Sequence, residues 1–288
     1  MTTIIDTGRE VAPPLHLGRL LRSERIKMMS TNTWWLLSIG VLVTTGLALL
    51  VNIGMADSDL TSPDSPATGQ AVADEAANIF TSGQYFGGLF VMLLGILLIT
   101  NEYYHQTATM TFLATPRRTY VIIGKFVTAM LAAATVWVVT TAIDLAFGSI
   151  FFAETGFATH LGDWTVLRAI GINLLMFALW GVFGIGLGAL LRSQIGATVT
   201  ATLLYTIGTY AALLVFVVIR VYVITTDSVF KGLVIVPSIA AQVAEGSKDL
   251  AIPRGQIPPW WVGVLVMLGY GLTTAVIGTL ILRRRDVS

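Results

Sequence analysis

The sequence predicts an all-α membrane protein in which six helices cross the bilayer as a single domain. Charged residues make up only 11% of the 288-residue chain and hydrophobic residues 55%, whereas soluble domains are about 25% charged. The mean hydropathy is +0.79. The sequence contains six apolar stretches, and each has about the 20 residues that are needed to cross a hydrocarbon core. No separate soluble domain is expected.

The expected first and last spans each begin with a pair of tryptophans, Trp34–Trp35 and Trp260–Trp261. Tryptophan is enriched at membrane–water interfaces, so these pairs are predicted to lie at the interface where each span begins. The six expected spans are Trp34–Gly54, Ser82–Thr100, Phe126–Phe147, Val166–Leu191, Gly196–Ile219 and Trp260–Leu282.

The segment before the first span divides into two parts. Residues 1–14 are polar, contain two prolines and are expected to be a flexible tail, so that the transmembrane domain covers residues 15–288. Leu15–Met29 alternates apolar and basic residues at helical spacing. Such a helix can lie flat on an anionic membrane surface with its cations among the headgroups. The alternative is a plain cluster of positive charge beside the membrane.

The distribution of lysine and arginine predicts the orientation. If the N-terminus is cytoplasmic, the inner segments hold 12 of the 17 basic residues. The first outer loop, Met55–Thr81, then holds five acids and no base. Both termini are therefore expected in the cytoplasm.

The outer loop between spans five and six, residues 220–259, contains an apolar piece, Phe230–Val243, interrupted by Pro237. The piece is too short to span, and irregular backbone is not tolerated in contact with lipid. It is expected either to pack on the outer surface or to enter the membrane partway, covered by protein.

Polar residues inside spans are costly and often functional. Asp144 is the only acid well inside an expected span, and Arg168 starts the next span at a similar level. An outer-interface salt bridge or simple solvation of Asp144 is one interpretation, and a role in a substrate cavity is the other. Asn173 is expected either to form a hydrogen bond across helices or to contact a substrate.

Span five carries hydroxyl and tyrosine side chains along one helical face, spaced i, i+4, i+7 and i+11. Threonine hydroxyls can bond their own helix carbonyls while the face packs on a neighbour, or the face can form the wall of a translocation path. Two glycine pairs, Gly83/Gly87 and Gly184/Gly188, permit close approach of helices. The residues of the face are Thr198, Thr202, Tyr205 and Thr209.

Motifs for chemistry are missing from the sequence. It has no phosphate-binding loop, no H-E-x-x-H and no G-x-S, so no catalytic residue, metal ligand or bound cofactor is expected of this chain. A secondary transporter or proton pump would carry more buried ionisable groups. No basic groove interleaved with aromatic residues suggests nucleic acid, and an intramembrane enzyme ranks last among the function classes.

The longest inner interval is Asn101–Lys125, which is polar, aromatic and basic. Ordered polar residues there and in the N-terminal amphipathic segment resemble the ABC-2 type permease family, the membrane subunits of one large class of ATP-driven exporters. This chain departs from the family pattern at Gln106, where glycine is usual, and in having two arginines directly after its proline. The matching residues are Glu24 and Lys27 before Trp34, then Glu102, Thr107, Thr109, Leu113, Pro116, Arg117, Arg118 and Lys125.

The resemblance covers nearly the whole chain and implies an N-terminal elbow helix at 15–29 and a cytoplasmic coupling helix within 101–125. It implies two separate cytoplasmic ATPase subunits, which bind ATP and Mg, and a second permease copy or a paralogue. The location implied is the bacterial inner membrane, in contact with lipids. The elbow residues are Arg22, Glu24 and Lys27, and the ATPase-coupling residues are Glu102, Tyr103, His105, Thr107, Thr109, Thr111, Pro116, Arg117 and Arg118.

The expected function is export of an amphipathic or hydrophobic substrate, such as a drug, lipid or peptide, driven by a partner ATPase. The argument from the residues agrees, since a transporter without a nucleotide motif needs a cytoplasmic contact and 101–125 is the only inner loop long enough. The alternative is a non-transporting scaffold or sensor that recruits a soluble partner through the same loop.

Overall fold

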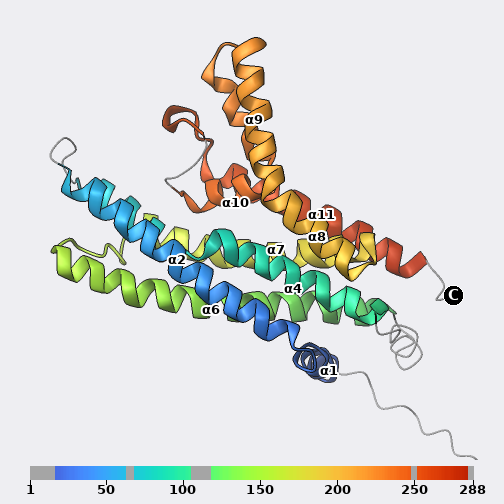
Figure 1. Ribbon diagram of the computed structural model, residues 1–288. Helices are drawn as coiled ribbons and strands as arrows, with labels where there is room; N and C mark the ends of the chain where they lie inside the picture. Colours follow the sequence, from blue (N-terminus) through green and yellow to red (C-terminus); the bar gives the residue numbers. More distant parts are fainter. Residues whose placement is uncertain (1–16, 63–67, 105–117, 248–251, 285–288) are drawn as a thin grey trace, which may run out of the picture.

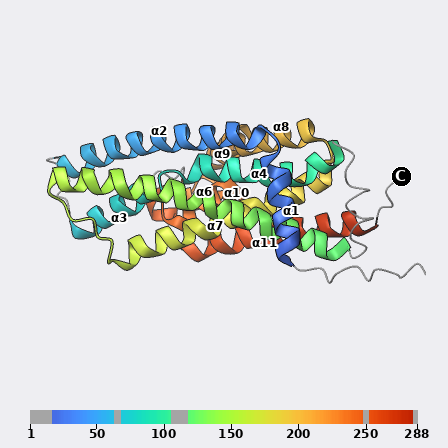
Figure 2. The ribbon, with the colours of Figure 1, turned by 90° about the horizontal axis from the view of Figure 1, so that it is seen from below.

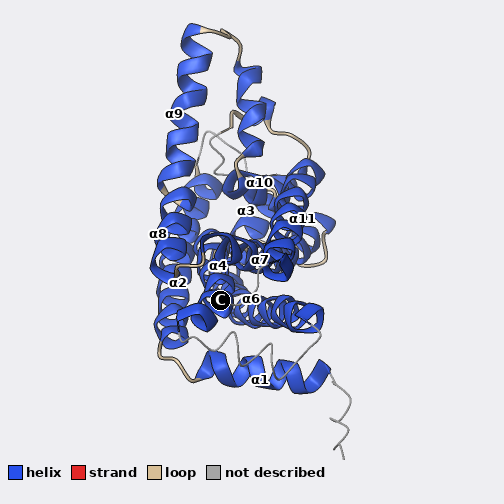
Figure 3. Ribbon diagram, turned by 90° about the vertical axis from the view of Figure 1, so that its right-hand side faces the viewer, coloured by secondary structure: helices blue, strands red, loops and turns tan. Residues whose placement is uncertain are grey.

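The computed structural model describes residues 17–62, 68–104, 118–247 and 252–284. All regular structure in these ranges is helical (Figures 1 and 3), without a strand among them. The helices are α1 (Leu17–Met29), α2 (Thr33–Thr61), α3 (Gly69–Phe80), α4 (Gln84–Tyr104), α6 (Arg118–Thr155), α7 (Trp164–Leu191), α8 (Gln194–Tyr205), α9 (Ile207–Tyr222), α10 (Pro237–Glu245) and α11 (Trp260–Arg284), with short 3₁₀ helices η1 (Asp227–Ile235) and η2 (Arg254–Gln256).

The expected all-helical architecture is confirmed for the described residues. Six helical stretches among the described residues are long and apolar enough to cross a membrane, or up to seven if the bent pair η1–α10 counts as one more. The most apolar 18 consecutive residues of each have a mean hydropathy between 1.8 and 2.2. The six are Thr33–Thr61, Gly69–Tyr104, Tyr120–Thr155, Trp164–Leu191, Gln194–Tyr222 and Trp260–Ile281.

The first outer loop differs from the expectation. Most of Met55–Thr81 is helical, because α2 continues to Thr61 and α3 forms a buried helix that leads through a short turn into α4. The side chain of Thr68 caps α3 by accepting a hydrogen bond from the backbone N–H of Ala71 at 3.3 Å. The alanines of α3 favour helix, but its acids and glutamine lower its hydropathy below that of a typical span.

Helix α7 is the centre of the bundle and packs against α3, α4, α6, α10 and α11. Its contact with α4 is close because glycines face the neighbouring backbone. A β-carbon at Gly184 would overlap the carbonyl oxygen of Met92, and one at Gly188 would lie 3.0 Å from the carbonyl oxygen of Ile96. The close approach expected from the Gly184/Gly188 pair is therefore present.

Helix α1 lies crosswise to the spanning helices. In Figure 1 it is seen end-on while α2 and α6 run across the view, and Figure 2 shows it crossing beneath the bundle. It lies near the end of the bundle where α4 ends and α6 begins. An amphipathic helix at this place was predicted from the periodicity of Leu15–Met29.

The fifth span is made of two helices, α8 and α9, which meet at Thr206. Helix α9 projects from the rest of the bundle (Figures 1 and 3) and, although described throughout, buries none of its residues. It packs mainly on η1. At Pro237 the chain turns by 102° into α10, which packs on α7 and α11. The interruption expected at Pro237 is confirmed.

Replacement of Gly184 by alanine is expected to destabilise the α4–α7 contact, because the new methyl group must displace backbone rather than a flexible side chain. Overpacking of this kind costs about 1–3 kcal/mol. Thermal unfolding of the purified protein in detergent would measure it. Gly171→Ala is the matched control in the same helix, where a β-carbon meets nothing within 4 Å; equal melting temperatures for the two variants would contradict the packing account.

Candidate functional site

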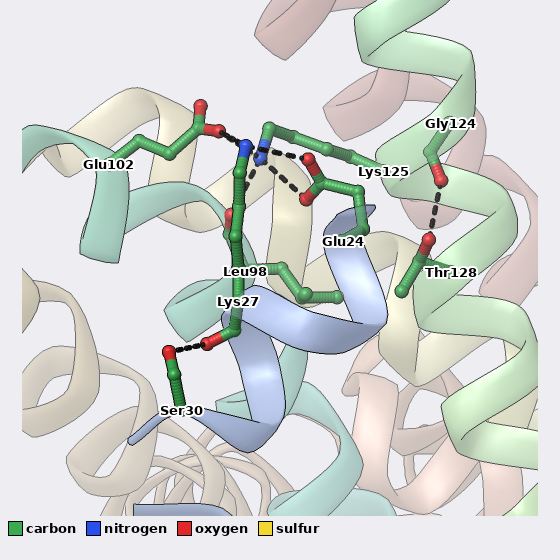
Figure 4. Close-up of polar contacts among 8 residues, drawn as sticks. All are labelled: Glu24, Lys27, Ser30, Leu98, Glu102, Gly124, Lys125 and Thr128. Carbon is green, nitrogen blue, oxygen red and sulfur yellow. Dashed lines mark hydrogen bonds and ion pairs between the residues drawn. The ribbon is translucent and has the colours of Figure 1, made fainter. Parts of the chain in front are cut away.

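Four charged side chains from three helices meet at one end of the bundle (Figure 4). Lys125 Nζ lies 2.9 Å from Glu24 Oε2 and 3.0 Å from Glu102 Oε1. Lys27 Nζ lies 3.0 Å from Glu24 Oε1 and 2.8 Å from Glu102 Oε1. Two acids and two bases thus form a closed cycle, which we call the charge network.

Each helix places its members by simple spacing. Glu24 and Lys27 are three residues apart in α1 and therefore share a face. Glu102 is in the last turn of α4, and Lys125 lies about two turns into α6. Lys125 also donates a hydrogen bond to the carbonyl oxygen of Leu98 at 2.9 Å. The network therefore ties α1 to both helices that flank residues 105–117.

Burial makes these ion pairs depend on one another. The side chains of Lys125, Glu24 and Glu102 are 4%, 5% and 8% exposed, and that of Lys27 is 37% exposed. Removing one partner of a buried pair leaves an uncompensated charge. Partial burial alone would lower the pKa of Lys27, but its hydrogen bonds with Glu102 and Glu24 and their negative charges outweigh burial, so the pKa is raised.

The helices around the expected coupling segment are longer than predicted. Glu102 and Lys125 were placed at the ends of a polar interval, 101–125, yet both are helical and buried, and only residues 105–117 separate α4 from α6. Tyr103 packs beside a small apolar cluster of α4, α6 and α7. Arg118 begins α6. His105, Thr107, Thr109, Thr111, Pro116 and Arg117 lie outside the described residues.

Lys125 pairs with Glu24, and this contact was not predicted from the sequence. The available signal was a lysine followed by an unbroken apolar helix, since such a charge inside a membrane helix requires a counter-charge. The partner itself is 101 residues away in sequence, and no local pattern identifies it. Among the expected elbow residues, Glu24 and Lys27 enter the network, whereas Arg22 is exposed on a different face of α1.

A second polar feature is a hollow of about 450 Å³ between α2, the α3–α4 turn, α9 and α10. Hydrogen bonds link its amides across elements: Asn52 Nδ2 donates to Ser82 Oγ at 2.8 Å, and Asn78 Nδ2 to Asn52 Oδ1 at 3.4 Å. Ser247 Oγ donates to Asn78 Oδ1 at 3.4 Å. The other polar lining residues include Gln84, Tyr85, Thr209, Tyr210, Gln242 and Glu245.

All three threonines of the span-five face donate to carbonyl oxygens one turn back, Thr209 to that of Tyr205 at 2.5 Å, but they differ in what else they face. Thr198 and Thr202 donate to carbonyl oxygens one turn back in their own helix, at 2.9 Å each, and do not line the hollow. Tyr205 is buried and donates to the carbonyl oxygen of Tyr85 at 2.5 Å. Thr209 lines the hollow and lies 2.6 Å from Ser238 Oγ. Of the four, only Thr209 faces this space.

Asp144 is neither solvated nor paired with Arg168, contrary to the first interpretation. It is buried, and its Oδ2 accepts a hydrogen bond from the backbone N–H of Gly83 at 3.2 Å. Arg168 instead places its guanidinium 5.6 Å from the centre of the Trp260 ring. Asn173 bonds across helices, donating to Glu245 Oε1 at 3.1 Å in a buried contact.

Comparison with known proteins gives one family match, which covers residues 32–288. The chain belongs to the DUF2705 family, described as a protein of unknown function. The matched region includes all six spans and begins just after α1. No curated protein matches the chain.

Substitution of Lys125 by methionine is expected to destabilise the protein strongly, because Glu24 and Glu102 then share one half-exposed lysine. Breaking a buried pair from one side costs about 3–5 kcal/mol, which corresponds to a drop of about 10 °C in melting temperature. Arg220→Gln is the control, since it removes an exposed pair with Asp227 worth about 0–1 kcal/mol. Similar melting temperatures for both variants would show that the charge network is not structural.

Asp144→Asn and Asp144→Leu are expected to differ. Asparagine keeps an oxygen that can accept from Gly83, so its stability should equal or exceed that of the parent protein. Leucine leaves the buried N–H of Gly83 without its acceptor, at a cost of about 1–3 kcal/mol. Thermal unfolding of the two variants side by side tests the assignment, which fails if leucine is tolerated as well as asparagine.

Proposed function

We propose that this protein is the membrane subunit of an ATP-driven exporter of the ABC-2 type, working with a separate cytoplasmic ATPase. The observation that carries the proposal is the charge network, because it joins α1 to the ends of α4 and α6 between which residues 105–117 lie. In the ABC-2 permease family that the sequence resembles, this interval contacts the ATPase. The expected location is the bacterial inner membrane, with both termini in the cytoplasm.

Force applied to residues 105–117 would pass into both flanking helices. Glu102 is two residues from the end of α4, and Lys125 is seven residues into α6. The network fixes these two helices to each other and to α1, so the three move as one unit. Because α4 packs closely on α7, the movement extends to the centre of the bundle.

The polar hollow is the best candidate for part of the substrate path. It combines amides and hydroxyls with Tyr85, Phe86 and Tyr210, a mixture that suits an amphipathic molecule such as a drug, lipid or peptide. It is bordered by α2 and α9, which leave much of their apolar surface uncovered. In our proposal a second permease copy or a paralogue covers this side and completes the path.

Purification of the tagged chain from native membranes in mild detergent tests the proposal. The expected result is a co-purifying soluble protein with phosphate-binding-loop and signature motifs, at about one copy per permease by analogy with the family. If the complex trapped with ATP contains no ATPase, the exporter assignment is wrong. A soluble partner without a nucleotide motif would instead support a scaffold or sensor.

The half-exposed member of the network gives a functional test that should spare folding. Lys27→Gln is expected to leave the complex assembled but to lower substrate-stimulated ATPase activity about fivefold or more, the usual lower range of a coupling free energy. Reconstituted vesicles with the purified complex would measure transport and ATP hydrolysis together. Lys231→Gln is the control, an exposed lysine in η1. Unchanged coupling in Lys27→Gln would remove the network from the mechanism.

A further inference from the structure

A groove of about 650 Å³ lies between α1, α2, α4 and α6. Its arginines are on a different face of α1 from the charge network. With 100° per residue, Gly18, Arg22, Arg25 and Met29 form one stripe, and Glu24 and Lys27 lie more than a quarter-turn away from it. Leu21 and Met28 also line the groove and lie between these two sets, so the arginines and the ion pairs are on opposite sides of α1 while the groove extends between them.

The rim of the groove on α1 is cationic. Arg22 and Arg25 are three residues apart, exposed, and both line the groove. Within the described ranges neither guanidinium forms an ion pair. Two adjacent guanidinium groups without carboxylate partners match a phosphate, which arginine can bind through paired N–H donors.

The wall of the groove on α6 is apolar. Thr128, Leu131, Ala132 and Thr135 lie on one face, at i, i+3, i+4 and i+7. Both threonine hydroxyls donate to carbonyl oxygens of their own helix, Thr128 to Gly124 at 2.8 Å and Thr135 to Leu131 at 2.9 Å, so they add no free polar group to the wall. This wall extends about 10 Å along a helix that is apolar enough to cross the membrane.

We propose that the groove binds one anionic phospholipid, with its phosphate against Arg22 and Arg25 and one acyl chain along α6. The wall belongs to a membrane-spanning helix with Leu131 exposed, so the surrounding lipid is the ligand that can reach it. The cationic rim selects lipids with net negative charge. The proposal is more specific than a general attraction of a basic helix to a membrane surface, because it assigns the lipid to a defined cavity.

The two halves of the site contribute differently. An acyl chain that enters the groove leaves one apolar environment for another, so it gains shape-dependent packing but little hydrophobic free energy. Selectivity therefore depends on the arginines, each of which contributes about fivefold near an anionic headgroup. Charge removal should weaken binding of the anionic lipid, and filling the groove should exclude every lipid.

Native mass spectrometry of the full chain in mild detergent tests the charge requirement. The protein is titrated with phosphatidylglycerol or phosphatidylcholine carrying the same acyl chains. We expect one phosphatidylglycerol retained per chain in preference to phosphatidylcholine, and binding about 25-fold weaker in the double variant Arg22→Gln/Arg25→Gln. Arg192→Gln, which removes a charge at the C-cap of α7 outside the groove, should bind as the parent protein does.

A second variant tests the cavity without altering charge. Ala132→Phe fills the groove and should abolish retention, whereas Ala211→Phe, on the exposed surface of α9, should leave it unchanged. Equal retention of the two lipids by the parent protein would overturn the proposal. So would unchanged phosphatidylglycerol binding in the double arginine variant or in Ala132→Phe.

Discussion

The ion pairs of Lys125 are the interaction on which this end of the molecule depends. An ammonium group buried in a membrane protein requires counter-charges close by, and here they come from two other helices, through Glu24 and Glu102. Helix α1 therefore cannot leave the bundle without depriving Lys125 of one partner. A short amphipathic helix that composition alone would place loosely on the membrane surface is fixed in position by electrostatics.

The rest of the molecule consists of a tightly packed body around α4 and α7 and a less covered arm formed by α9. Glycines bring the backbones of α4 and α7 together, with Trp180, Phe177 and Met92 filling the core around them. Backbone in contact with backbone has little freedom to adjust, so this body is suited to move as a unit. Helix α9 buries nothing and packs mainly on η1. The polar hollow lies where body and arm meet.

Hydropathy and periodicity predicted the features that depend on local sequence: six apolar stretches, the amphipathic α1 and the break at Pro237. They failed where a distant contact decides the outcome. The polar residues of α3 suggested a loop, although the bundle buries most of that helix. Asp144 was expected in solvent, in an outer-interface salt bridge or in a substrate cavity; its partner in the structure is a backbone N–H 61 residues earlier, in the turn between α3 and α4. Of the hydroxyl face of span five, only Thr209 lines the polar hollow, and only the fold separates it from the rest.

The two faces of α1 give the helix a role beyond anchoring. One face enters the charge network with α4 and α6, and the other borders a cationic, lipid-sized groove against α6. A lipid bound in that groove would contact the same two helices, α1 and α6, that the Glu24–Lys125 pair holds together. Its headgroup would add charge complementarity on the side opposite to the ion pairs, where Arg22 and Arg25 form no ion pair with any residue in the described ranges. The position of α1 would then depend both on the protein's own carboxylates and on the anionic lipid of the membrane around it.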